Sequence, residues 1–167
     1  MRGIWVVVSV LALAAVVGGL FVVRASARPK RPIQPIAFSH KVHAGDYKIA
    51  CEYCHPYVRR STVAGVPSVQ QCIGCHKITA VDKPEVQKLR GYWDRKEPIP
   101  WSKVHDLPDF VIFTHKRHVL KGVECQTCHG PVDTMEQVRQ VASLEMGWCV
   151  SCHKERQASL ECLDCHK

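Results

Sequence analysis

Five short motifs of one spacing carry the chemistry of this sequence. Ten cysteines occur among 167 residues, and all ten fall into Cys-x-x-Cys pairs that are each followed directly by histidine. Zinc ribbons use paired Cys-x-x-Cys elements but have no need of a histidine after each, and a disulfide framework has no such need either. Cys-x-x-Cys-His is the attachment signature of c-type haem, so five covalently bound c-type haems are predicted. The predicted thioether residues are Cys51, Cys54, Cys72, Cys75, Cys125, Cys128, Cys149, Cys152, Cys162 and Cys165. The predicted proximal iron ligands are His55, His76, His129, His153 and His166.

Five further histidines remain, one for each iron that needs a sixth ligand. His40 and His43 stand three residues apart, and so do His115 and His118. Side chains three residues apart on a helical turn share one face, so each pair is predicted to give distal ligands to two neighbouring haems. His105 is predicted to give the fifth distal ligand, although a surface histidine is more often only a solvated side chain.

One methionine competes with these histidines as an iron ligand. Met146 stands three residues before Cys149, and a thioether ligand would raise the potential of its haem. The alternative is a methionine that fills a gap between haem faces. Ligation by Met146 would free one of the five histidines, and both interpretations stay open.

The haem motifs belong to an internal duplication. Residues 38–55 and 113–129 both read Phe, Ser or Thr, His, Lys, any residue, His, a short spacer and Cys-x-x-Cys-His. Each half continues to a second site, and an extra fifth site follows the second half. The predicted units are a two-haem half, a Pro-rich linker that carries His105 and is expected to be extended, and a three-haem half. Their bounds are 38–77, 78–110 and 111–167.

The haem-bearing region is too short to build an ordinary core around each cofactor. Roughly 26 residues are available per haem, so the haems themselves must form much of the core. The predicted fold class is therefore a multihaem cytochrome c. Behind an N-terminal transmembrane helix, we expect a mostly irregular, haem-packed domain with short helices and little secondary structure, all-α by class.

An apolar run near the N-terminus predicts a membrane anchor. Residues 4–23 contain no charge, and a run of this length is long enough for a helix to cross a bilayer. A cleaved signal peptide is the alternative, since residues 25–27 read Ala-Ser-Ala, but its apolar region usually spans 7–15 residues. We therefore predict a transmembrane anchor over residues 1–24 and a basic linker over residues 25–37.

Two indications of orientation conflict. Four basic residues follow the apolar run and one precedes it, which would place the haem region in the cytoplasm. Haem attachment to Cys-x-x-Cys-His, however, generally takes place on the outer face of the energy-transducing membrane. Five haem motifs outweigh four charges, so we predict a single-pass protein of the cytoplasmic membrane with its haem domain on the periplasmic face. The basic linker is then available to meet lipid headgroups or an acidic subunit.

The net charge of the polypeptide changes once the propionates of the predicted haems are included. The formal net charge is +8, but five haems bring about ten propionate carboxylates, which can cancel the excess. Nucleic-acid binding is therefore not predicted from the basic composition.

The Phe-x-His-x-x-His segment ahead of Cys-x-x-Cys-His resembles class III multihaem cytochromes. The stretch WSKVHDLPDFVIFTHKRHVLKGVECQTCHG, with the anchor and five sites, is similar to the pentahaem subunit of bacterial alternative complex III. This resemblance implies an electron carrier without a catalytic site of its own. The implied partners are an iron–sulfur subunit, integral membrane subunits, another cytochrome c and a soluble electron acceptor.

Two other functions remain as alternatives. A multihaem reductase of the nitrite or sulfur type needs an iron with an open position, and five spare histidines leave no evident vacancy. A stand-alone quinol dehydrogenase needs an acid–base group beside its first haem, and none is evident in the sequence.

Overall fold

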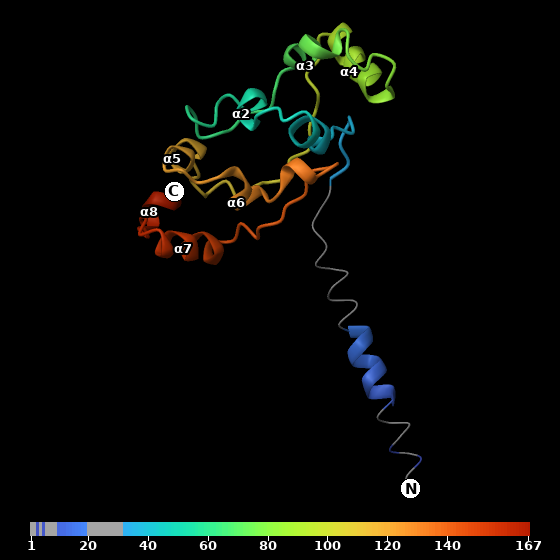
Figure 1. The fold of residues 1–167 in the computed structure, drawn as a ribbon. Coiled ribbons are helices and arrows are strands. Elements are labelled where there is room, and N and C mark those ends of the chain that lie inside the picture. Colours follow the sequence, from blue (N-terminus) through green and yellow to red (C-terminus); the bar gives the residue numbers. More distant parts are fainter. Residues whose placement is uncertain (1–2, 4, 6–9, 20–31) are drawn as a thin grey trace. The chain divides into compact units, whose positions relative to one another are not determined.

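The computed structural model describes Gly3, Trp5, residues 10–19 and residues 32–167 (Figure 1). The chain divides into two units, Met1–Lys30 and Arg31–Lys167. In the first unit, residues 10–19 are helical. None of the helices in the described parts is long and apolar enough to cross a membrane. The transmembrane anchor predicted over residues 1–24 and the basic linker predicted over residues 25–37 both lie partly outside the described residues.

Short helices joined by irregular segments make up the second unit (Figure 1). All five Cys-x-x-Cys pairs lie within helices, namely α2, α3, α6, α7 and α8. The predicted short helices and low content of regular structure are therefore confirmed. The elements are η1 (Lys41–Asp46), α2 (Cys51–Cys54), α3 (Val69–His76), α4 (Pro84–Asp94), α5 (His115–Leu120), α6 (Cys125–His129), η2 (Val132–Thr134), α7 (Met146–Glu155) and α8 (Cys162–Cys165).

The Pro-rich linker differs from its prediction. An extended connection was expected over residues 78–110, but α4 forms within it and is an eleven-residue helix. Pro84 occupies the first turn of α4, where its fixed φ favours helix and its missing N–H costs no bond. One face of α4 packs against α3, so Leu89 joins a small apolar cluster. The buried members of this cluster are Ile36, Ile73, Leu89 and Ile99.

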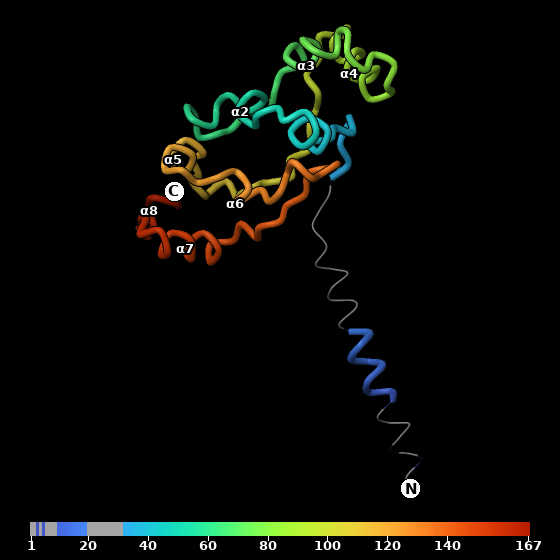
Figure 2. The backbone as a smooth tube through the Cα atoms, viewed as in Figure 1, coloured from blue at the N-terminus to red at the C-terminus, as the bar shows by residue number. Residues whose placement is uncertain are grey.

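A second contact joins the two halves of the duplication. The backbone N–H of Lys41, in η1, donates to the carbonyl of Met135 over 2.9 Å. Met135 follows η2 and is only 2% exposed. A β-carbon at Gly45 would collide with the carbonyl of Asp133, so η1 and η2 approach backbone to backbone. Figure 2 traces these two segments, far apart in sequence, running beside each other.

The end of the chain returns to the second half. An isolated antiparallel bridge joins Val111 to His166. On either side of this bridge, the N–H of Ile112 donates to the carbonyl of Cys165 over 2.8 Å, and the N–H of Lys167 donates to the carbonyl of Phe110 over 3.2 Å. These bonds fix α8 against the segment that leads into α5.

Candidate functional site

Each half of the duplication builds the same cluster of one phenylalanine and two histidines. In the first half, the ring of Phe38 is edge-on to His40 at 4.8 Å and stacked on His43 at 4.4 Å between centroids. In the second half, Phe113 is edge-on to His115 at 4.9 Å and stacked on His118 at 4.6 Å. The interplanar angles also agree, at 88° and 28° in the first half against 87° and 28° in the second. The repeated sequence therefore gives a repeated side-chain arrangement, although η1 is a π-helix and α5 an α-helix.

Backbone carbonyls fix the orientation of the histidines in these clusters. The Nδ1 atoms of His43 and His118 lie 2.8 Å and 2.9 Å from the carbonyls four residues earlier. His115 Nδ1 lies 2.9 Å from the carbonyl of Thr62, in the other half of the duplication. A histidine that donates Nδ1–H to a carbonyl presents its Nε2 lone pair, which is the tautomer required of a metal ligand.

Three of the predicted proximal histidines are held in the same way. His55 Nδ1 lies 2.6 Å from the Gly65 carbonyl, and His76 Nδ1 lies 3.1 Å from that of Thr79. His153 Nδ1 lies 2.7 Å from the carbonyl of Ser159. These acceptors belong to the backbone, so no residue type in the sequence could have pointed to them.

Three pairs of imidazoles have the separation that a shared iron requires. Two rings that bind one iron from opposite faces have centroids about 6 Å apart, since each metal–nitrogen bond is about 2 Å and each ring centre lies about 1 Å behind its nitrogen. The centroids of His115 and His129 are 6.3 Å apart. Those of the other two pairs, His43 with His76 and His118 with His153, are 6.0 Å and 6.1 Å apart. The residues therefore fit c-type haem with two histidine ligands.

By analogy with His115 and His129, the duplication implies a fourth pair, His40 with His55. His40 is partly buried, and its Nδ1 atom is buried without a hydrogen-bond partner. Burial, followed by the nearby imidazoles of His55 and His43, lowers the pKa of His40 to about 4. A low pKa keeps the imidazole neutral, which is the form that binds iron.

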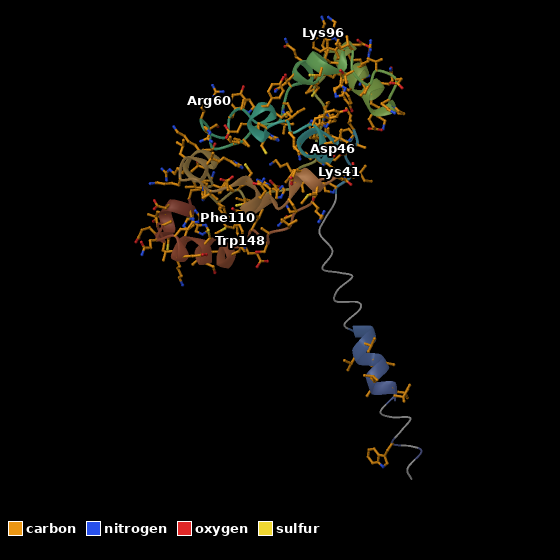
Figure 3. The ribbon with its side chains drawn as sticks, in the orientation of Figure 1. Lys41, Asp46, Arg60, Lys96, Phe110 and Trp148 are labelled. Carbon is orange, nitrogen blue, oxygen red and sulfur yellow. The ribbon has the colours of Figure 1, made fainter. Side chains whose placement is uncertain are left out.

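Two candidates for a distal ligand remain, His105 and Met146. His105 contacts His129, with ring centroids 4.3 Å apart. The ring that lies against His166 is that of Phe110, labelled in Figure 3, at 5.9 Å and an interplanar angle of 27°. Met146 begins α7 and is 66% exposed. No sequence pattern pointed to Phe110, because only the fold brings it to the C-terminal motif.

The five motifs follow one another through the fold in a definite order. We call them sites 1 to 5 in sequence order, named by their proximal histidines: site 1 (His55), site 2 (His76), site 3 (His129), site 4 (His153) and site 5 (His166).

Before haem is attached, the cysteine side chains of neighbouring sites lie close enough to affect one another's thiol pKa. Burial raises the pKa of Cys54, and Cys51 of its own site and Cys75 of site 2 raise it further. Burial also raises the pKa of Cys125 in site 3, followed by the effect of Cys51 in site 1. Sites 2, 1 and 3 therefore lie in that order.

The remaining sites continue the series. Burial raises the pKa of Cys128 in site 3, and the site 4 thiols Cys152 and Cys149 raise it further. Burial raises the pKa of Cys149, followed by the effect of Cys165 in site 5. The full order is 2, 1, 3, 4, 5, as the succession of α3, α2, α6, α7 and α8 in Figure 1 also displays.

Two cytochrome c families match separate parts of the chain. Residues 21–105 match the class III cytochrome C family, and residues 111–167 match the family described as cytochrome c7 and related cytochrome c.

Two curated relatives come from Nitratidesulfovibrio vulgaris. One, a menaquinone reductase multiheme cytochrome c subunit, is 36% identical over 97 residues, or 58% of this chain and 45% of the relative. The other, a high-molecular-weight cytochrome c, is 28% identical over 145 residues, or 70% of this chain and 26% of the relative. The chain thus spans less than half the length of either relative. Since the first family match alone covers about half of the chain, and the haem-motif geometry agrees with it, this protein belongs to the class III cytochrome C family.

Proposed function

We propose that this protein is a five-haem electron relay that works as a subunit of a quinone-reactive membrane complex. The observation that carries the proposal is the single file of five attachment sites. Each site neighbours the next, and the file ends at site 2 and at site 5. Bound c-type haem supplies one-electron redox chemistry, and the polypeptide's part is to fix spacing, ligation and access.

The chain's own residues divide this work in a regular way. His40 and His115 are proposed as distal ligands at the first site of each half, and His43 and His118 at the second. Backbone carbonyls bonded to Nδ1 hold His43, His115 and His118 in the ligand tautomer. Phe38 and Phe113 pack against both rings of their pairs, which keeps the two histidines apart and directed at different sites.

The finer proposal places the protein in alternative complex III. Electrons would come from a quinol-oxidising membrane subunit through an iron–sulfur subunit, and leave to another cytochrome c or a soluble periplasmic acceptor. The resemblance of residues 38–167 to the pentahaem subunit supports this assignment. The apolar run over 4–23 supports a single-pass anchor in the cytoplasmic membrane, and the five haem motifs support placing the haem domain on the periplasmic face.

Electron flow in the opposite direction is the second candidate. One relative is a subunit of a menaquinone reductase, in which electrons end on the quinone. The same file of sites would serve either direction, because the direction of electron flow is set by the difference in reduction potential between the partners at its two ends. The discriminating observation is which partner reduces the haems.

The test begins with purification from membranes without crosslinking. Co-purification of an iron–sulfur subunit and integral membrane subunits is expected, and the complexed haems should then be reduced by quinol. Haems that only a cytochrome reduces, with electrons reaching added menaquinone, would favour the opposite direction. Purification of the protein without membrane subunits would contradict both.

The two alternatives from the sequence have their own tests. The isolated subunit should not be reduced by quinol, whereas a stand-alone quinol dehydrogenase would be. A nitrite or sulfur reductase would turn over its substrate with the haems as electron donor. Site 5, where Phe110 lies against the proximal histidine, is the place to look for an open iron position.

A further inference from the structure

The structure assigns His105 a positioning role: its Nε2 accepts a hydrogen bond from Nδ1–H of His129, so that it orients a proximal ligand and does not bind an iron. This inference rests on the proposal that His129 binds haem iron at site 3. It replaces the expectation that His105 is the fifth distal ligand.

The distance between the two rings excludes a shared iron. His129 Nδ1 and His105 Nε2 are 3.3 Å apart, whereas two nitrogens bound to one metal from opposite sides would be about 4 Å apart. The ring centroids are 4.3 Å apart, well short of the 6.0–6.3 Å found for the three ligand pairs. An interplanar angle of 81° points one ring at the edge of the other, as a nitrogen-to-nitrogen hydrogen bond requires.

The direction of the hydrogen bond follows from the role of His129. In Cys-x-x-Cys-His sites 1, 2 and 4, the proximal Nδ1 faces a backbone carbonyl. If His129 is oriented like these three histidines, its Nε2 binds iron and its Nδ1 carries the proton. His105 Nε2 must then be the acceptor of the hydrogen bond. His115 lies at the ligand separation from His129, so site 3 already has its distal histidine.

Site 3 differs from its duplicate, site 1, in the group that faces Nδ1 of the proximal histidine. The Nδ1 of His55 faces the carbonyl of Gly65, whereas that of His129 faces an imidazole. Hydrogen bonding from Nδ1–H raises the basicity of a ligating histidine, which stabilises the oxidised metal. Both His105 and His129 are partly buried, so water competes little for this bond. His105 should thus lower the potential of one haem.

The experiment compares His105→Ala and His105→Gln with His115→Ala in the haem-loaded protein. His105→Ala should keep the haem count by intact mass and leave the spin states as in the wild type. It should raise the reduction potential of one haem by about 59 mV, which is a tenfold change in the equilibrium constant of a one-electron reduction. His105→Gln offers an amide oxygen as acceptor and should raise that potential less. His115→Ala is the control and should turn one haem high-spin.

Two results would overturn the inference. A high-spin haem in His105→Ala would show that His105 is a distal ligand after all. Unchanged potentials in His105→Ala would show that it does not position His129. Neither result touches the proposed relay, which fails only if the wild-type protein lacks haems or exchanges no electrons with a quinone-reactive complex.

Discussion

Single hydrogen bonds decide which ring nitrogen is free in three of the proposed distal histidines. His43 and His118 both bond a carbonyl within their own helical turn, while His115 reaches Thr62 in the other half of the duplication. Each bond leaves Nε2 available, and each is made by a group that mutation of a side chain cannot remove. The proposed ligation therefore depends on the path of the backbone as much as on the placement of the histidines.

His43 and His118 should behave alike because their surroundings are duplicated. We expect His43→Ala to turn one haem high-spin, at site 2, and His118→Ala to do the same at site 4. Haem attachment should persist in both, because the thioether bonds do not depend on the distal ligand. Electron paramagnetic resonance of the oxidised protein measures the change, and five low-spin haems in either variant would refute the assignment.

The position of Phe110 against His166 leads to a separate prediction about site 5. Within residues 32–167, which the structure describes and which hold all ten histidines, the ring against His166 is a phenylalanine. We expect one haem of the wild-type protein to differ from the four with two histidine ligands, either high-spin or bound by Met146. Phe110→His should convert it to a low-spin haem that no longer binds carbon monoxide.

Met146→Leu separates the two forms of that prediction. Leucine keeps roughly the volume of methionine, so packing costs should stay below about 1.5 kcal/mol. Loss of one high-potential component in a redox titration would identify Met146 as a ligand. An unchanged titration, together with carbon monoxide binding, would identify an open position. Five haems with two histidine ligands each would contradict both forms.

At the scale of elements, local motifs were predictable and long connections were not. The Phe-x-His-x-x-His and Cys-x-x-Cys-His segments each fix their geometry within one or two turns, so their helices and ring clusters follow from sequence. The linker prediction gave too much weight to proline, because Pro84 begins α4 and does not break it. The position of His105 depends on how this linker returns to α6, and no local pattern encodes that path. The boundaries of the two haem halves stay predictions.

The close contact between η1 and η2 should make the stability of the fold sensitive to a single added methyl group at Gly45. Gly45→Ala would drive a β-carbon into the Asp133 carbonyl, a backbone atom that cannot rotate away. We expect a loss of about 1–3 kcal/mol in the free energy of unfolding, as for other overpacked sites. Urea titration of the haem-loaded protein measures it.

Gly91→Ala is the matched control for that measurement. Gly91 lies inside α4, where an added β-carbon meets only the flexible guanidinium of Arg95 at 3.1 Å. Alanine there should leave stability unchanged or raise it by up to about 1 kcal/mol. Equal urea midpoints for the two variants would show that η1 and η2 do not pack as described.

For the whole molecule, the file of sites has two ends with different surroundings. At site 2, Ile78 follows the proximal histidine by two residues and is 83% exposed; at site 5, Leu163 lies between the two cysteines and is 84% exposed. Exposed aliphatic groups beside an attachment site are suited to contact with an electron-transfer partner. Opposite ends of a relay should meet different partners.

Polar substitution at each end should therefore slow exchange with one partner only. Burying a leucine or isoleucine stabilises a contact by about 1.5–3 kcal/mol, so Ile78→Gln and Leu163→Gln should each weaken one encounter about tenfold or more. Stopped-flow rates with each partner measure this, and reduction by dithionite is the control that should not change. Equal effects on both partners from one variant would contradict separate ends.

The most direct test of a five-site relay is the mass of the intact protein under denaturing conditions. Thioether bonds survive denaturation, so the mass should equal that of the polypeptide plus five haems. Replacing Cys162 and Cys165 by alanine should reduce the number to four and leave the other sites filled. A wild-type mass with four or fewer haems would contradict the relay, since the file of neighbouring sites would then be broken or shortened.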